Sequence, residues 1–314
     1  MDAVIAGIDV AKDKLDIAIR PSGERFVVAR DSAGLDALIV RCRAAGVTMA
    51  GLEATGGYET VVAASLSGAG FHVAVVNPAQ VRSFAKALGK RAKTDPIDAG
   101  VIAHFIEATK PAVRALPDAK AMAFGDLVGR RGQIIAMIQA EQNRKARCVS
   151  KRLLKSLERL LKALQKELCD LDGQIREAVQ ASPLWRAKDE LLESVPGVGP
   201  QIASRIIADL PELGALSRRQ IAALVGLAPW TRQSGQWKGK SFISGGRADV
   251  RCALFMGALV AMRHNSVLKA FYERLLAAGK AKKIAIIAVA RKLLTMLNAI
   301  LRDNRPWRQE DVHA

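Results

Sequence analysis

The chain has few cysteines, the residues that form disulfide bonds in extracellular proteins and bind zinc in structural metal sites. Its four cysteines stand far apart and form no C-x-x-C pair, so neither a zinc site nor a disulfide framework is predicted. The N-terminus lacks the positively charged segment of a signal peptide. The longest apolar run, residues 252–262, is well short of the roughly 18 residues that cross a bilayer. These absences predict a soluble cytoplasmic protein with no membrane partner.

Charge is unevenly distributed along the chain. Residues 1–111 carry 13 Lys and Arg against 12 Asp and Glu, which leaves 35 basic and 18 acidic residues for positions 112–314. A basic surface confined to one segment favours a polyanion, most often nucleic acid, because neutralised phosphates release condensed counterions. A solvated cationic surface or an anionic membrane would explain the charge less specifically.

Three segments of different texture divide the 314 residues. In the first, we expect strands at residues 4–8, 15–19, 24–29, 47–52 and 71–76, with helices at 32–44, 59–69, 79–88 and 96–108. Ser32 is the expected N-cap of the first helix. Three strands followed by alternating helices and strands predict an α/β fold, a mixed sheet with flanking helices.

The rest of the chain is expected to be mostly α-helical. Between residues 118 and 182, leucines recur at helical spacing and Gly and Pro nearly vanish, which predicts two long antiparallel helices or a coiled-coil arm. Such an arm would serve dimerisation or act as a spacer. Beyond residue 191 come short helices with Gly/Pro turns, and two or three helices are expected over 250–302. The predicted domains are residues 1–112, 113–185 and 186–314.

Four carboxylates in the first segment follow strands or begin a helix. Asp9 ends the first strand, Glu53 ends another, and Asp95 and Asp98 flank Pro96 at a helix start, where a spacing of three places both on one face. Two Mg²⁺ ions, for which Mn²⁺ can substitute, need such an oxygen-only set to act on a phosphodiester. Asp95 alone would also serve as an N-cap. Actin-like ATPases and proofreading-type exonucleases begin similarly, but the Gly-rich phosphate loops of the former and the D-x-E start of the latter are missing.

Residues 230–251 form a polar, glycine-rich and basic loop between apolar flanks. A serine beside glycine among cations is suited to attack phosphorus, and Ser234, Ser241 and Ser244 all qualify. A loop that binds nucleic acid without catalysis is the alternative. The cations expected to hold phosphates are Arg232, Lys238, Lys240, Arg247 and Arg251.

A second nucleic-acid contact is predicted at the turn S-V-P-G-V-G-P, residues 194–200. This pattern is typical of a helix-hairpin-helix, in which Pro196, Gly197 and Gly199 let backbone N–H groups at a helix N-terminus approach a phosphate. A turn used only for packing would give the same pattern.

Ordered motifs then give the chain a family resemblance. They are G-I-D-V-A-K-D-K-L-D, E-A-T-G-G-Y, V-N-P-A-Q-V-R-S-F-A, K-T-D-P-I-D-A, S-V-P-G-V-G, L-V-G-L-A-P and G-G-R-A-D-V-R-C-A-L-F-M. In these the chain closely resembles the DEDD transposases of the insertion sequence 110 (IS110) family, relatives of the Piv DNA invertases. The resemblance implies a RuvC-like domain with an RNase H fold, followed by a C-terminal transposase domain.

The resemblance also implies roles for particular residues. The family's four acidic positions fall on Asp9, Glu53, Asp95 and Asp98, and its nucleophilic serine falls on Ser234. It implies donor and target DNA as substrates, a noncoding bridge RNA as guide, and a homodimer that assembles to a tetramer. It further implies a bacterial, nucleoid-associated enzyme. Carboxylates of one protomer would complete the site around the serine of another.

Two other functions remain open on the sequence. A RuvC-like junction-resolving endonuclease would use the carboxylates with water as nucleophile and leave the Ser234 loop without a catalytic task. A non-enzymatic architectural protein would explain the charge but not the four carboxylates.

Overall fold

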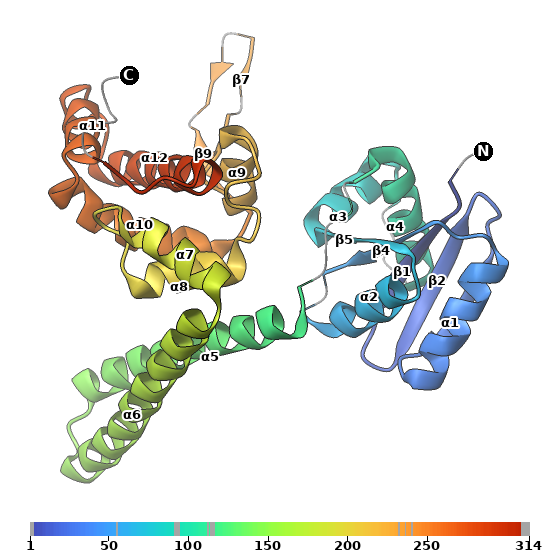
Figure 1. Cartoon of the computed structure of the whole chain (residues 1–314), viewed down its shortest axis with the longest axis horizontal. Helices are drawn as coiled ribbons and strands as arrows, with labels where there is room; N and C mark the ends of the chain where they lie inside the picture. The colour runs from blue at the N-terminus through green and yellow to red at the C-terminus, as the bar shows by residue number, and fades with distance from the viewer. Residues whose placement is uncertain are drawn as a thin grey trace. The chain divides into compact units, whose positions relative to one another are not determined.

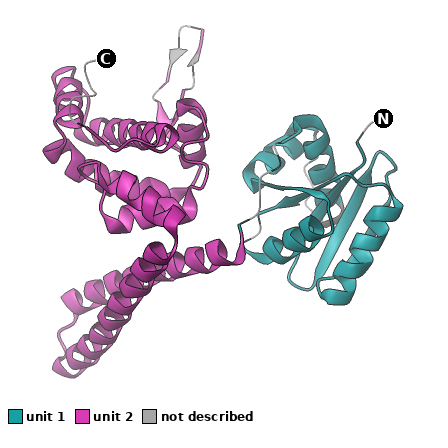
Figure 2. Cartoon of the chain, in the orientation of Figure 1, with its two compact units in different colours: residues 1–117 teal, residues 118–314 magenta. Residues whose placement is uncertain are grey.

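The structure is a computed structural model that describes residues 3–308, except 55, 91–94, 112, 114–116, 232, 236 and 240. The chain forms two compact units, Met1–Pro117 and Asp118–Ala314 (Figure 2). The first contains the sheet, and the described residues of the second are helical apart from loops and four very short strands (Figure 1). The predicted division into three domains, with the arm separate from the C-terminal helices, stays a prediction.

A five-stranded mixed sheet forms the centre of the first unit. Its strands are β1 (Ile5–Val10), β2 (Lys14–Arg20), β3 (Arg25–Ala29), β4 (Met49–Glu53) and β5 (His72–Val76). Their order is β3-β2-β1-β4-β5. The first three pair antiparallel, whereas β4 runs parallel to β1 and β5 parallel to β4. The predicted mixed sheet is confirmed, and the arrangement fits an RNase H-like domain.

Helices cover both faces of this sheet. On one face, β1 and β2 pack with α1 (Ser32–Ala44) and α2 (Tyr58–Gly68) around side chains such as Ile8, Leu38 and Leu66. On the other face lie α3 (Pro78–Ala87) and α4 (Asp95–Thr109). Val76 of β5 and Ile102 of α4 are among the side chains buried there. These two layers of apolar contact account for strands that are buried on both sides.

The predicted N-cap of α1 is wrong by one residue. Asp31, not Ser32, has the extended backbone of a cap, and its side chain accepts a hydrogen bond from the Gly34 N–H at 2.8 Å. A carboxylate and a hydroxyl are both good caps. Because Asp31 and Ser32 are adjacent, the sequence alone does not show which of them has the extended backbone of a cap.

The second unit begins with the predicted pair of long helices, α5 (Ala119–Arg147) and α6 (Lys151–Ala181), which we call the arm. Buried Ile134, Leu164 and Leu171 form part of the seam between them. An ion pair from Arg131 to Asp172, 2.6 Å long, crosses the same seam. The arm is therefore a helical hairpin held by apolar contacts along one side of each helix.

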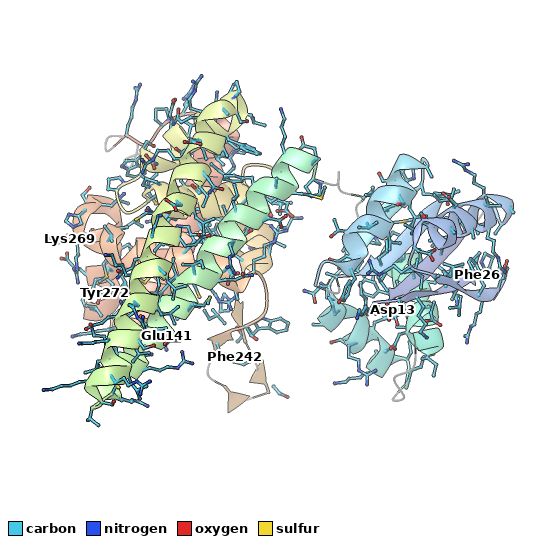
Figure 3. The ribbon with its side chains drawn as sticks, turned by 90° about the horizontal axis from the view of Figure 1, so that it is seen from below. Asp13, Phe26, Glu141, Phe242, Lys269 and Tyr272 are labelled. Atoms are coloured by element: carbon cyan, nitrogen blue, oxygen red, sulfur yellow. The ribbon has the colours of Figure 1, made fainter. Side chains whose placement is uncertain are left out.

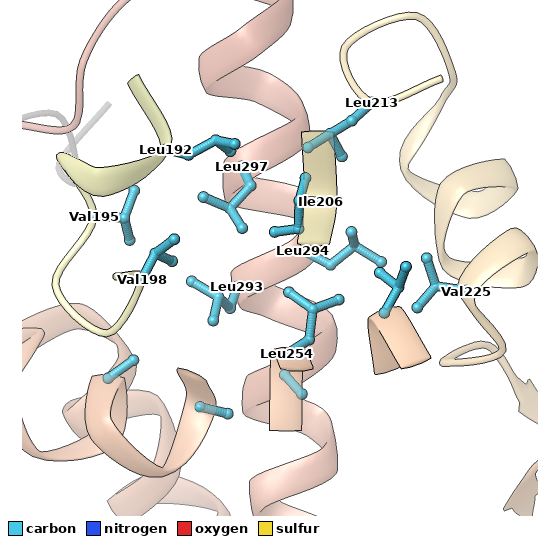
Figure 4. Packing of buried hydrophobic residues seen from close by; sticks show 14 of the residues in the cluster. Leu192, Val195, Val198, Ile206, Leu213, Val225, Leu254, Leu293, Leu294 and Leu297 are labelled. Carbon is cyan, nitrogen blue, oxygen red and sulfur yellow. The ribbon is translucent and has the colours of Figure 1, made fainter. Parts of the chain in front are cut away.

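The remaining helices build a separate apolar core. They are α7 (Pro183–Glu193), α8 (Pro200–Asp209), α9 (Arg218–Val225), α10 (Ala248–His264), α11 (Ser266–Ala277) and α12 (Lys282–Asp303). Figure 4 shows Leu293, Leu294 and Leu297 of α12 surrounded by side chains from several of these helices. By length and composition α12 passes as a membrane span, but its inner residues have no exposed surface in this core. Two or three helices were expected over residues 250–302, and the structure has three there, α10, α11 and α12.

The loop over residues 230–251 contains short strands that the sequence did not predict. β6 (Pro229–Trp230) pairs with β9 (Phe242–Ile243), and between them β7 (Gln233–Ser234) pairs with β8 (Trp237–Lys238). Strands of two residues carry no periodicity for a sequence to show.

Candidate catalytic site

Asp9 and Glu53 lie beside each other at the carboxyl ends of neighbouring strands. The parallel pairing of β1 with β4 places Ile8 opposite Leu52, so the next residue on each strand is a predicted metal ligand. Parallel neighbours stand about 4.8 Å apart, and residues at the same register point to the same face of the sheet. Both side chains are partly exposed.

The face that carries these two carboxylates is the face covered by α4. Gly7 and Gly51 share this face, since each stands two residues before a carboxylate. A Cβ at Gly7 would lie 2.2 Å from the Ala99 carbonyl oxygen, and one at Gly51 would lie 2.4 Å from the Ile106 side chain. Glycine at both positions therefore lets α4 pack directly on the strands.

The start of α4 points toward the same end of the sheet. Near its other end, Glu107 accepts a hydrogen bond from Arg20 at 2.8 Å, and Arg20 is opposite Ile5 at the beginning of β1. Moving back along α4 toward its N-terminus, the helix passes Gly7 and continues in the direction of Asp9. Asp98, which is partly buried, lies in the first turn.

The side chain of Asp95 lies outside the described residues, although its backbone begins α4. Three elements thus direct the backbone positions of the four predicted carboxylates to one end of the sheet. Their assignment as metal ligands stays a prediction.

A fifth carboxylate, which sequence reasoning missed, faces Asp9. Asp16 of β2 is opposite Asp9 in the antiparallel pairing, so the two side chains share a face. Asp16 is only 3% exposed and forms a 3.0 Å ion pair with Lys14. The sequence did contain a signal for this residue: Asp16 is an aspartate at a core position of a strand pattern. Buried carboxylates are rare unless they are paired, so such a residue points to a specific partner.

The four predicted ligands all offer carboxylate oxygens, and a hard divalent cation takes such oxygens as ligands. The side chains that the structure describes do not form a group of three or more His, Cys, Asp and Glu close enough to hold a metal ion. The side chain of Asp95, one of the four predicted ligands, is not among them.

Ser234 stands at the tip of a small hairpin. Its backbone pairs with that of Trp237, and Gly235, the residue after it, has the positive φ of 56° that tight hairpin turns favour. The Ser234 side chain is exposed, as are Ser241 and Ser244. Exposure alone does not separate the three serines.

Two of the predicted phosphate-binding arginines hold the base of this loop. Arg247 donates to both carboxylate oxygens of Glu212, at 2.5 and 2.7 Å, and to the Asp209 carbonyl. Arg251 donates to the carbonyls of Val225 and Gly245. Contact with nucleic acid stays a prediction for both, beside this structural role. Arg232 and Lys240, and the side chain of Lys238, lie outside the described residues.

The turn predicted to be a helix-hairpin-helix joins α7 to α8. The Val198 N–H donates to the Val195 carbonyl at 3.0 Å, with Pro196 and Gly197 (φ 108°) between them. A Cβ at Gly197 would lie 2.6 Å from the Ala261 Cβ on α10, so this glycine is also needed for packing.

Gly199 provides the N-cap residue of α8 without a side chain to cap it. An uncapped helix start is the arrangement to which a phosphate binds, and that contact stays a prediction.

Comparisons with known proteins place both halves of the chain in one family. Residues 6–152 match a family model of DEDD transposases of the IS110 type, described as "Transposase". Residues 189–273 match a second model, described as "Transposase IS116/IS110/IS902 family".

Individual relatives agree with these matches. The chain is 27% identical to "Pilin gene-inverting protein" of Moraxella lacunata, over 98% of each chain. It is 30% identical to "Insertion element IS110 uncharacterized 43.6 kDa protein" of Streptomyces coelicolor, over 47% of this chain and 36% of that protein. It is 31% identical to "Insertion element IS900 uncharacterized 42 kDa protein" of Mycobacterium paratuberculosis, over 45% of this chain and 35% of that protein.

Proposed function

The chain belongs to the IS110 family of DEDD transposases, and from this premise we propose that it cuts and rejoins DNA through a covalent link to Ser234. It is a DNA transposase or recombinase, so its substrates are DNA strands. The proposal concerns how the strands are exchanged, and which residues exchange them.

The observation that carries the proposal is the pairing of Asp9 and Glu53 at one end of the sheet, with the start of α4 directed to the same end. Four carboxylates from three rigid elements would repel one another if nothing neutralised them, because like charges at short range disfavour ionisation. A divalent cation, Mg²⁺ in this proposal, removes that repulsion and polarises the scissile phosphate when it is bound. Asp9, Glu53, Asp95 and Asp98 are the residues that would hold it.

Ser234 is the proposed nucleophile. Its Oγ forms a bond to phosphorus, the bond from phosphorus to one sugar oxygen breaks, and the serine proton ends on the released sugar hydroxyl. The hydroxyl of a partner strand then attacks the phosphoserine, which releases Ser234 and restores a phosphodiester. Each step exchanges one phosphate ester for another, so no ATP is needed.

The partners in this proposal are donor DNA, target DNA and a guiding bridge RNA, with two dimers forming a tetramer. Carboxylates of one protomer then serve the serine of another. A bacterial enzyme with these partners acts at the nucleoid in the cytoplasm. Support for RNA and for the tetramer comes from family membership only.

The test is to trap the covalent intermediate. The full chain is incubated with Mg²⁺, its element's flanking DNA and the noncoding RNA encoded beside it, and the products are separated under denaturing conditions. We expect a protein–DNA adduct that Ser234→Ala abolishes, whereas the matched variants Ser241→Ala and Ser244→Ala retain it. An adduct that survives Ser234→Ala rules out this serine as nucleophile. Hydrolysed ends without any adduct would instead support a metal-dependent junction-resolving nuclease that uses water.

A further inference from the structure

The arm is strongly polarised in charge along its length. Residues 141–166, which form its far end, contain nine Lys and Arg against two Asp and Glu. The remaining arm residues, 118–140 and 167–181, contain four basic against six acidic residues. Figure 3 shows nitrogen-tipped side chains around the far end of the two helices, near Glu141. The positive charge is therefore local to the end of the arm.

Five of the cations follow a single face of α6, and we call them the arm stripe: Lys151, Lys155, Arg159, Lys162 and Lys166. Neighbours in the arm stripe are three or four residues apart, the spacing at which helical side chains lie one above another. The row extends over 15 residue steps, or roughly 22 Å at 1.5 Å per residue. All five side chains are exposed.

The arm stripe lies opposite the face through which α6 packs on α5. Buried Leu161 and Leu164 belong to the packed face. Rotation by about 100° per residue puts the arm stripe within one sector of about 80° and these leucines well outside it. The helix thus has an apolar face inward and a row of cations outward.

These cations are not neutralised within the described part of the chain. The two acidic residues at the far end, Glu141 and Glu158, pair with Arg144 and Lys145, neither of which belongs to the arm stripe. No member of the arm stripe forms an ion pair among the described residues.

The arrangement also works against the stability of the helix. Like charges three or four residues apart repel one another. The first turn of α6 has no acidic residue and begins with Lys151 and Arg152, although the N-terminus of a helix favours negative charge. A row of cations that destabilises its own helix and has no internal partner suits an external anion.

Two other occupants fit the arm stripe less well. Single-stranded nucleic acid is held by stacking on aromatic rings as well as by cations. The arm has one aromatic residue, Phe124, which is 2% exposed. A second copy of the arm offers only the acidic excess of two at the near end of its helices, against an excess of seven cations at the far end. One of its carboxylates, Asp172, is already paired with Arg131.

We propose that the arm stripe binds the phosphate backbone of double-stranded DNA, without reading its sequence. Duplex DNA carries on each strand one negative charge per 3.4 Å of helix axis, so a straight row of about 22 Å meets several phosphates. The proposal deepens the function proposed above, because it names where the DNA substrate is held. All members of the arm stripe except Lys151 lie between the two ranges that match the family models, which are residues 6–152 and 189–273.

The experiment measures how DNA binding by the full chain depends on salt. A 30-base-pair duplex is titrated with the protein, with chelator present so that no strand is cut, at several KCl concentrations. The variant carries Lys151→Gln, Lys155→Gln, Lys162→Gln and Lys166→Gln together. The control carries Lys86→Gln, Lys90→Gln, Lys120→Gln and Lys269→Gln, four exposed lysines outside the arm stripe. Both lose the same charge.

For the arm-stripe variant we expect the slope of log K against log salt to become shallower by about 3 to 4, since each phosphate contact contributes about 0.9. Its affinity should fall roughly ten-fold or more at 0.15 M salt. The control should keep its slope to within about one unit. Far-UV circular dichroism should show that α6 remains helical.

Several results would overturn the proposal. An unchanged slope in the arm-stripe variant, or an equal loss in the control, would reduce the arm stripe to part of a diffuse positive field. Loss of binding to a duplex RNA of the same length, with duplex DNA unaffected, would assign it to RNA. A smaller oligomer in light scattering with DNA binding intact would assign it to a second copy. A chain that never forms a serine adduct would still show the expected slope, so the two proposals fail separately.

Discussion

The two units place their proposed functional residues in opposite ways. In the first unit, Asp9 and Glu53 are fixed by neighbouring strands, and Gly7 has no room for a single added carbon. In the second unit, Ser234 lies exposed at the tip of a hairpin with two paired residues per strand. The first unit has nearly equal numbers of basic and acidic residues, whereas the second carries almost the whole positive charge.

This difference matches what each kind of group requires. Metal ligands have to be held to within about half an ångström, which strands and packed helices achieve better than loops. A nucleophile that attacks a large substrate and is then released needs access and room to move. The comparison predicts that rigidity matters in the first unit and local backbone conformation in the second.

The largest effect is expected for Asp9→Asn. Loss of a carboxylate ligand removes transition-state stabilisation of several kcal/mol, so DNA cleavage should fall on the order of 1,000-fold. DNA binding should change less than about two-fold, because the proposed phosphate contacts lie on the basic unit. Cleavage and binding are measured on the same duplex. Asp13→Asn, on an exposed turn of the same unit, is the control. Full cleavage by Asp9→Asn would remove the first unit from the chemistry.

Gly7→Ala should destabilise the first unit. The new methyl group would lie 2.2 Å from the Ala99 carbonyl oxygen and 2.3 Å from the Ala103 nitrogen, so α4 has to move. Overpacking of this kind costs about 1–3 kcal/mol, and hydrogen exchange of β1 measures it. Gly68→Ala, with open space around its Cβ, should be neutral or stabilising. Equal protection in both variants would show that α4 is not held tightly on the sheet.

Gly235→Ala should reduce activity without reducing stability. Its φ of 56° costs a residue with a Cβ about 1 kcal/mol, which distorts the hairpin and displaces Ser234. We expect adduct formation to slow roughly ten-fold, with the thermal midpoint unchanged. Gly235→Asn, which tolerates this conformation, should recover most of the rate. A lowered thermal midpoint would mean that the hairpin contributes to the stability of the second unit, as Gly7 does to that of the first.

The smallest effect concerns Asp189 of α7. Burial raises the pKa of this carboxyl from 3.8 to about 6, with help from Glu193 and Glu190. The folded chain therefore holds the proton more tightly than the unfolded chain does. The resulting cost in stability is absent below about pH 4 and complete above about pH 6.

Because the side chain is partly exposed, this cost is about 1 kcal/mol. Asp189→Asn should remove it, so the variant gains stability above pH 6 and loses the contribution of Asp189 to the pH dependence between 4 and 6. Urea unfolding at several pH values measures the change, with exposed Asp170→Asn as the control. Parallel curves for wild type and Asp189→Asn would contradict the assignment.

The sequence predicted the sheet unit well because its signals are local. Strands of five to seven residues with apolar patterns, ended by breaks such as Asn77-Pro78, indicated each element, with boundaries within two residues of those in the structure. The four carboxylates were selected as candidate metal ligands from their places at strand ends and a helix start, and that assignment stays a prediction. Asp16 was missed because its place beside Asp9 depends on the partner strand, since only the register sets the two residues opposite each other.

The basic unit was less predictable for the same physical reason. The four short strands around Ser234 are defined by pairing and not by periodicity, and chemistry alone left Ser241 and Ser244 as equal candidates. The need for glycine at position 197 arises partly from Ala261, more than 60 residues away. Contacts of this kind have no signature in a short window of sequence.

The length of the arm helices can be expressed in base pairs. The 31 residues of α6 extend about 46 Å, and the arm stripe occupies the half farthest from α7. At 3.4 Å per base pair, the arm stripe lies roughly 7 to 14 base-pair steps from the base of the arm. DNA held along the arm would thus be protected from nucleases over about one further turn of the duplex. The length of α6 would then set how many base pairs the enzyme protects.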